Sequence, residues 1–263
     1  MEFTSYPDGA VSWVDLATTD VAGAKRFYAG LFGWTFSDLP IDSGGVYSMA
    51  EIEGKQVTGL GQLPPEMQQQ GVPPMWTAYV NHHSIDLVVE RTGEAGGSVL
   101  MPPLDVMDSG RMTNIQDPTG AAIGVWQPKQ HKGAQLQHVP GALTWAELQT
   151  KDVPAAKKFY HAVFDWDYEV DANDYVLAKK GDNALAGMME IQEDWGETPP
   201  NWTVYFQSGD VEASVVKVKE LGGSVLVPPM PAGELGKFAV AQDPQGAVFS
   251  ILEYKAAPDG SAG

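Results

Sequence analysis

Two carboxylates lie two residues after a tryptophan in short alternating segments, SWVDL and TWAEL. Asp15 follows Trp13 in the first segment, and Glu147 follows Trp145 in the second. Residues two apart share one face of a β-strand, so each carboxylate should point to the same side as its tryptophan. Such a carboxylate can act as a general base with a raised pKa or pair with a cationic ligand, which makes Asp15 and Glu147 candidate catalytic residues. In the structural alternative, each accepts a hydrogen bond from a Trp N–H or a Tyr hydroxyl.

Cysteine and histidine offer little further chemistry. The absence of cysteine excludes disulfides, thiolate metal sites and a cysteine nucleophile. His82 and His83 are adjacent, so extended backbone should point their side chains apart. His131 and His138 fall in a polar segment, and His161 falls on what should be the exposed side of a helix. We expect solvated or locally bonded histidines and no His–carboxylate pair at metal-ligand spacing.

The chain is an internal duplication. Residues 9–36 match residues 141–168 with 13 identities in 28 gapless positions, GGSVLMPP recurs as GGSVLVPP, and QDPTGA recurs as QDPQGA. A polar segment bounded by prolines, residues 128–140, separates the copies and is typical of a linker. We therefore expect a first module at 1–127 and a second at 141–256.

The same elements are predicted in each copy. A first strand precedes a helix capped by Asp20 or Asp152, and a second helix should begin near Ser84 or Asp210 and end at a Gly-Gly pair. The Asp-Pro-x-Gly motif predicts a hairpin turn before the last strand. Further strands are expected at 46–50, 58–62, 76–80, 98–101, 112–116 and 121–126 in the first copy, and at 175–178, 185–190 and 202–206 in the second.

This order of elements resembles the vicinal oxygen chelate superfamily, which includes glyoxalase I, extradiol dioxygenases and bleomycin-resistance proteins. The motifs that carry the resemblance are the strand, the capping Asp, the KxFY helix, the Gly-Gly-x-Val segment and the Asp-Pro-x-Gly hairpin. SWVDL and DPTGA are similar to its two-module glyoxalase-like or hydroxylase-like branch. The resemblance implies an α+β fold of two tandem modules, each of paired βαβββ units, with curved mixed sheets enclosing a cleft.

The resemblance also implies four metal-ligand positions, usually occupied by His, Gln or Glu. In this sequence they carry Trp13, Gly124, Trp145 and Ser250. None is a usual ligand, so we expect no metal and no cofactor, and metal-dependent glyoxalase or dioxygenase activity is disfavoured. Whether the protein is an enzyme stays open. The alternative is a displaced metal site built from Asp15 and Glu147.

The tryptophans suggest a different use of the cleft. Trp126 shares its alternation phase with Gly124, so it should face the cleft as Trp13 and Trp145 do. Indoles favour a flat or apolar ligand, or they fill the cleft and hold the modules together. The predicted ligand-binding residues are Trp13, Asp15, Trp126, Trp145 and Glu147.

Two functional hypotheses follow. The first is a metal-independent small-molecule binding protein, and the second is a glyoxalase-like lyase or a hydroxylase- or dioxygenase-like enzyme that uses Asp15 and Glu147. The net charge of −18 disfavours nucleic acid and membrane surfaces as partners. The sequence shows no secretory signal and no apolar stretch long enough to span a bilayer, so we expect a cytoplasmic protein, monomeric or homodimeric, with a small-molecule ligand.

Overall fold

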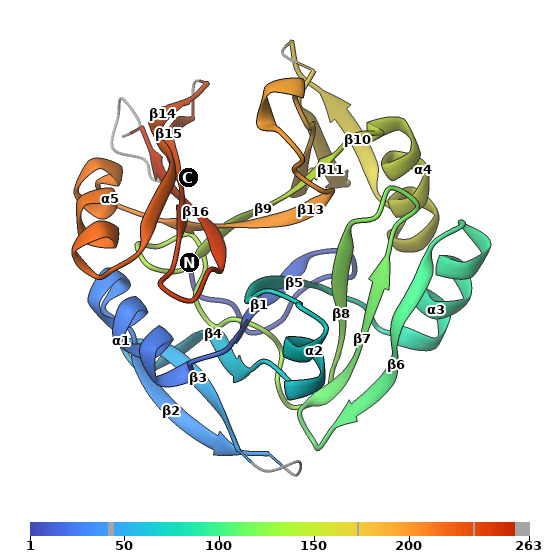
Figure 1. The fold of residues 1–263 in the computed structure, drawn as a ribbon. Helices are drawn as coiled ribbons and strands as arrows, with labels where there is room; N and C mark the ends of the chain where they lie inside the picture. Colours follow the sequence, from blue (N-terminus) through green and yellow to red (C-terminus); the bar gives the residue numbers. More distant parts are fainter. Residues whose placement is uncertain (42–44, 173, 234, 256–263) are drawn as a thin grey trace.

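Two eight-stranded mixed sheets form the protein, one from each half of the chain (Figure 1). The computed structural model describes residues 1–41, 45–172, 174–233 and 235–255. The strand order is β2-β3-β4-β1-β5-β8-β7-β6 in the first sheet and β10-β11-β12-β9-β13-β16-β15-β14 in the second, which is the same order twice. The predicted α+β fold with tandem modules is confirmed. Residue 256, the expected end of the second module, lies outside the described residues.

The elements of the two halves correspond one to one, apart from two short helical segments. The first half contains β1 (Val11–Thr18), α1 (Val21–Phe32), β2 (Thr35–Pro40), β3 (Val46–Ile52), β4 (Lys55–Gln62), α2 (Pro65–Gln69), β5 (Met75–Asn81), α3 (Ile85–Glu94), β6 (Ser98–Val106), β7 (Gly110–Gln116) and β8 (Ala122–Pro128). The second contains β9 (Leu143–Thr150), α4 (Val153–Phe164), β10 (Asp167–Val170), β11 (Val176–Lys180), β12 (Asn183–Glu190), the 3₁₀ turn η1 (Glu193–Trp195), β13 (Asn201–Gln207), α5 (Val211–Glu220), β14 (Ser224–Ala232), β15 (Gly236–Gln242) and β16 (Val248–Tyr254). The sequence did not predict β2, β10, α2 or η1. The two strands are mostly exposed edge strands and so carry no clear alternation of apolar residues.

The helix boundaries follow the predicted caps. The Asp20 carboxylate accepts a hydrogen bond from the Gly23 N–H at 2.9 Å, and Asp152 accepts one from the Ala155 N–H at the same distance. Ser84 and Asp210 cap α3 and α5 in the same way, as predicted. Each cap satisfies a backbone donor that would otherwise lack a partner in the first turn.

One continuous core joins the two modules. The alternate residues of β1 and β9, among them Val14, Leu16, Ala146 and Leu148, belong to it together with the buried faces of the helices. Helix α1 packs against α5 and α3 packs against α4, so the backs of the two curved sheets face each other (Figure 1). The faces that carry Trp13 and Trp145 are therefore turned away from the shared core. Among the described residues, no helix is long and apolar enough to cross a membrane.

The segment expected to be a polar linker covers the outer face of the first sheet. The Ala134 N–H donates to the Ser12 carbonyl at 2.8 Å, and the Trp126 indole N–H donates to the His131 carbonyl at 2.9 Å. The His131 ring packs edge-on against Trp13, with 4.5 Å between ring centroids. The interpretation of His131 as a solvated or locally bonded residue is therefore wrong, and burial lowers its pKa to about 4.

Candidate functional site

A carboxylate bonded to two tyrosines lies on the outer face of the first sheet. Asp15 accepts hydrogen bonds from the Tyr47 hydroxyl at 3.2 Å and from the Tyr79 hydroxyl at 3.3 Å. Trp13 donates its indole N–H to the Tyr47 hydroxyl at 3.1 Å. The expectation that Trp13 and Asp15 share a face is confirmed, and Trp126 packs in the same cluster.

The second sheet repeats this arrangement around a glutamate. Glu147 accepts hydrogen bonds from the Tyr175 hydroxyl at 2.9 Å and from the Tyr205 hydroxyl at 2.8 Å. Trp145 donates its indole N–H to the Tyr175 hydroxyl at 2.8 Å, and Gln149 adds a bond to the carboxylate at 3.3 Å. Both modules therefore hold a carboxylate by the hydrogen bonds of two tyrosines, one of which also accepts from a tryptophan.

Glycines in the neighbouring strands make room for the tyrosine rings. A Cβ atom on Gly59 would lie 1.9 Å from the Tyr47 hydroxyl, and one on Gly187 would lie 1.8 Å from the Tyr175 hydroxyl. At Gly124 a Cβ would lie 2.3 Å from the Tyr79 ring. These distances are far below van der Waals contact, so the absence of a side chain at these positions is a condition of the network.

Burial favours the protonated form of both carboxyl groups. It raises the pKa of Asp15 to about 7, while the hydrogen bonds from Tyr47 and Tyr79 act in the opposite direction. Burial also raises the pKa of Glu147, against the opposing effect of its tyrosine partners. The pKa values of Tyr79 and Tyr205 lie well above the usual value, mainly because of burial, so these hydroxyls stay protonated and act as donors. A carboxyl group with the pKa of Asp15 can donate or accept a proton near neutral pH.

The comparisons with known proteins identify the family. The sequence model of the Glyoxalase/Bleomycin resistance protein/Dioxygenase superfamily matches residues 10–125 and again residues 142–251. The chain belongs to this superfamily. The two matched segments correspond to the two sheets, as the internal duplication predicts.

Relatives of similar length come from Mycobacterium and Streptomyces. CFP32 of Mycobacterium tuberculosis, named provisionally as a glyoxylase, is 42% identical over 255 residues, which are 95% of this chain and 97% of the relative. The anthracycline biosynthesis protein DnrV of Streptomyces peucetius is 35% identical over 273 residues, covering 99% of this chain and 98% of DnrV.

Solved structures of the superfamily share the fold. The Mn(II)-bound glyoxalase from Novosphingobium aromaticivorans superposes with a TM-score of 0.63 at 14% identity, over 94% of this chain and 83% of that chain. The 2,3-dioxygenase LapB from Pseudomonas sp. KL28 gives 0.63 at 13% identity, over 96% of both chains. At such low identity these similarities concern the fold alone.

The residues at the superfamily's implied ligand positions do not fit a metal. Strand pairing aligns Trp13, Tyr79 and Gly124 in the first sheet, and Trp145, Tyr205 and Ser250 in the second. Indole and glycine offer no ligand, a neutral hydroxyl is a poor one, and the adjacent carboxylates already accept bonds from two tyrosines each.

The displaced metal site considered for Asp15 and Glu147 is not formed. The two carboxylates lie on different sheets, on faces turned away from the core between the sheets. For the same reason the five predicted ligand-binding residues do not line one cleft. Trp13, Asp15 and Trp126 lie in the first module, and Trp145 and Glu147 lie in the second.

A cavity borders Trp145 where the N-terminal segment and the start of β1 meet the second module. Its volume is about 320 Å³, and its walls include the apolar residues Phe3, Tyr6, Leu143 and Leu185. The matching face of the first sheet is covered by residues 131–134, which leaves Trp13 only 5% exposed. The two modules thus share a hydrogen-bond network but differ in what covers the tryptophan beside it.

Sequence reasoning missed two groups of residues. The four tyrosines could have been found in the repeat, because Tyr79 and Tyr205 occupy matching positions in WTAYV and WTVYF. The second group is Asp8 with His82 and His83, whose rings stack at 4.6 Å. The expectation that these two histidines point apart, with no carboxylate near, is wrong. Asp8 is distant in sequence, so no local pattern could have predicted the contact.

Proposed function

We propose that this superfamily member is a metal-independent binding protein for a flat or hydrophobic small molecule. The cavity beside Trp145 carries the proposal. It combines aromatic and aliphatic walls with a few polar groups, as small-molecule sites do. The residue types at the implied metal positions support a role without metal chemistry.

The proposed ligand class rests on the side chains that line the cavity and on the name of one relative. Phe3, Tyr6 and Trp145 offer ring faces or edges to a planar molecule. DnrV carries the name of an anthracycline biosynthesis protein, and anthracyclines contain a planar fused-ring system with phenolic hydroxyls. We therefore take a hydroxylated fused-ring aromatic as the first ligand class, with its rings against Trp145.

Calorimetric titration with a dihydroxyanthraquinone tests the proposal. Trp145→Ala should weaken binding roughly 5- to 150-fold, because a buried aromatic contact contributes about 1–3 kcal/mol. Trp13→Ala is the matched control, since it removes the equivalent indole from the covered module and should leave the affinity unchanged. Trp145→Phe keeps an aromatic wall and should give an intermediate affinity. Equal losses in the Trp13 and Trp145 variants, or no binding by the native protein, would overturn the proposal.

One observation favours a second candidate function, a lyase of the glyoxalase type that uses its buried carboxyl groups. The pKa of Asp15, about 7, suits a group that exchanges protons at neutral pH. CFP32 carries a glyoxylase name. Turnover of methylglyoxal with a thiol, lost in Asp15→Asn or in Glu147→Gln, would establish this function and replace the first.

The proposal extends to partners and location. With a net charge of −18, the chain repels nucleic acid and anionic lipid surfaces. A small molecule is therefore the proposed partner, and the cytoplasm is the proposed location.

A further inference from the structure

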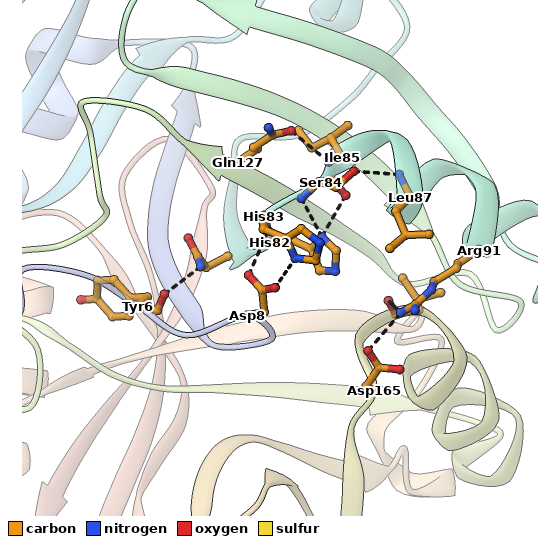
Figure 2. Close-up of polar contacts among 12 residues, drawn as sticks. Tyr6, Asp8, His82, His83, Ser84, Ile85, Leu87, Arg91, Gln127 and Asp165 are labelled. Carbon is orange, nitrogen blue, oxygen red and sulfur yellow. Dashed lines mark hydrogen bonds and ion pairs between the residues drawn. The ribbon is translucent and has the colours of Figure 1, made fainter.

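Three potential metal ligands meet where the N-terminal segment crosses the end of β5. Asp8, His82 and His83 each offer a ligand atom, and these atoms all lie within 4.8 Å of one another. Figure 2 shows the Asp8 carboxylate beside the two imidazoles, at the turn that leads into α3. The group lies outside both carboxylate–tyrosine networks and uses none of the superfamily's implied ligand positions.

We propose that Asp8, His82 and His83 bind a divalent first-row transition-metal cation such as Zn²⁺ or Ni²⁺. Two imidazole nitrogens and one carboxylate oxygen are donors that these cations accept, and water can complete the coordination. The proposal does not depend on the cavity beside Trp145 or on its ligand.

Neighbouring groups hold the two imidazoles in place. His82 is 3% exposed, and its Nδ1 lies 2.8 Å from the Ser84 carbonyl oxygen, to which it can donate. The Ser84 backbone N–H also lies 3.1 Å from Nδ1, so two contacts with Ser84 hold the ring. In the tautomer whose Nδ1–H donates to the carbonyl, Nε2 carries the electron pair, which is the usual arrangement around a metal-binding histidine. The stacking on His83, at 4.6 Å and 24°, keeps the second ring alongside the first.

The carboxylate is fixed by the same turn. Asp8 accepts a hydrogen bond from the His83 backbone N–H at 2.9 Å, and its second oxygen contacts His83 Nδ1. The Gly9 N–H donates to the Asn81 carbonyl at 2.9 Å, which holds the N-terminal segment against the end of β5. The site is therefore assembled from two distant segments by backbone contacts.

The charges around Asp8, His82 and His83 are compatible with a bound cation. Arg91 is a nearby positive side chain, and it forms an ion pair with Asp165 at 3.1 Å (Figure 2). His83 and Asp8 are 66% and 31% exposed, so a hydrated ion can reach them. The net charge of −18 raises the local concentration of cations further.

The internal repeat supplies a matched variant. Ser208 and Gly209 occupy the positions of His82 and His83 in the second copy, where the same turn precedes the capped helix α5. The double variant His82→Ser, His83→Gly therefore introduces residues already compatible with this turn. Circular dichroism would verify that it folds, and Asp8→Asn provides a second, milder variant.

Titration of the untagged protein with Zn²⁺ alone, by calorimetry and by equilibrium dialysis, tests the site. We expect one Zn²⁺ per chain, with affinity roughly 100-fold weaker in the double variant and about 10-fold weaker in Asp8→Asn. Co²⁺ should show the visible absorption of a nitrogen- and oxygen-ligated ion only in the native protein. His161→Asn removes a histidine elsewhere and should change neither result. No stoichiometric binding, or equal affinity in the native protein and the double variant, would overturn the proposal.

Discussion

At the residue scale, Gly124 shows why a residue with a side chain does not fit beside the hydrogen-bond network of Asp15 and Tyr79. A methyl group on Gly124 would lie 2.3 Å from the ring of Tyr79, which is itself only 5% exposed. Gly124→Ala must displace that ring from Asp15, and we expect a loss of about 1–3 kcal/mol in the free energy of unfolding, measured with urea. Gly93→Ala in α3 is the control, because its Cβ would meet no atom within 4 Å. In the control, the free energy of unfolding should rise by about 0.5–1 kcal/mol. An unchanged free energy of unfolding in Gly124→Ala would show that a side chain at this position can be accommodated.

The raised pKa of Asp15 predicts a dependence of stability on pH. Its pKa is about 7 in the folded protein, against 3.8 for the free group, so between these values the folded state holds a proton that the unfolded state releases. The free energy of unfolding should therefore fall as pH rises through this window, by at most about 1.4 kcal/mol per pH unit for one group.

The difference in unfolding free energy between the native protein and Asp15→Asn isolates this effect. Measured with urea from about pH 4.5 to pH 7.5, the difference should change steadily because asparagine does not titrate. Asp38→Asn is a control, since Lys25 holds the pKa of Asp38 below its ordinary value and outside this range. If the difference in unfolding free energy does not change with pH, the pKa of Asp15 in the folded protein is not raised.

Individual residues also show how much of the site could be predicted from the sequence. Alternation in SWVDL correctly placed Trp13 and Asp15 on one face, because a strand allows only two faces. It could not choose between catalytic and structural interpretations of Asp15, since the choice depends on partners from two other strands. The structure supplies these partners, Tyr47 and Tyr79, in the form that the structural alternative described. A catalytic role for Asp15 and Glu147 stays a prediction.

At the scale of elements, residues 128–140, which connect the two modules along the chain, differ most from their predicted structure. Its polar, proline-bounded composition is typical of an exposed linker, yet Ala134, Leu136 and Gln137 are buried. The contacts that bury them lie in β1 and in the N-terminal segment, as in the bond from the Phe3 N–H to the Gln135 carbonyl. Composition does not reveal such partners, so the cover over the first module could not be predicted.

His131 tests whether this segment closes the first module. Its ring packs on Trp13 and Trp126, so His131→Ala should expose both indoles and lower the free energy of unfolding by about 1–2 kcal/mol. Tryptophan emission should shift to longer wavelength, and acrylamide should quench it more strongly. His161→Ala removes a histidine from α4, away from these indoles, and should leave the quenching unchanged. Unchanged quenching in His131→Ala would contradict the proposed cover.

At the scale of the whole molecule, the repeat predicted two equal modules but not how they pack. Val14 and Leu16 alternate with Trp13 and Asp15 along β1, and both faces of the strand are rich in large side chains. The sequence therefore could not say which face meets the other module, and one common cleft was expected. The structure places the backs of the sheets and their helices in the shared core, which leaves two separate outer faces.

Reciprocal hydrogen bonds cross this core. The Tyr28 hydroxyl of the first module donates to Asp243 of the second at 3.1 Å, and the Tyr160 hydroxyl of the second donates to Asp117 of the first at 2.9 Å. Both carboxylates belong to the Asp-Pro-x-Gly turns, where their other oxygen accepts N–H groups of the turn. The hairpin turns predicted from the sequence thus also connect the modules.

Tyr28→Phe and Tyr160→Phe form a matched pair that tests whether the modules unfold as one unit. Each change removes a buried hydroxyl that also accepts an indole N–H, from Trp76 at 3.0 Å or from Trp202 at 2.8 Å. The unpaired donor and carboxylate should lower the free energy of unfolding by about 1–3 kcal/mol in either variant. Because one core spans both modules, calorimetry should show a single transition with equal calorimetric and van't Hoff enthalpies, shifted similarly by the two variants. Two resolved transitions, with each variant moving only one of them, would mean that the modules fold independently and that the shared core contributes little to their coupling.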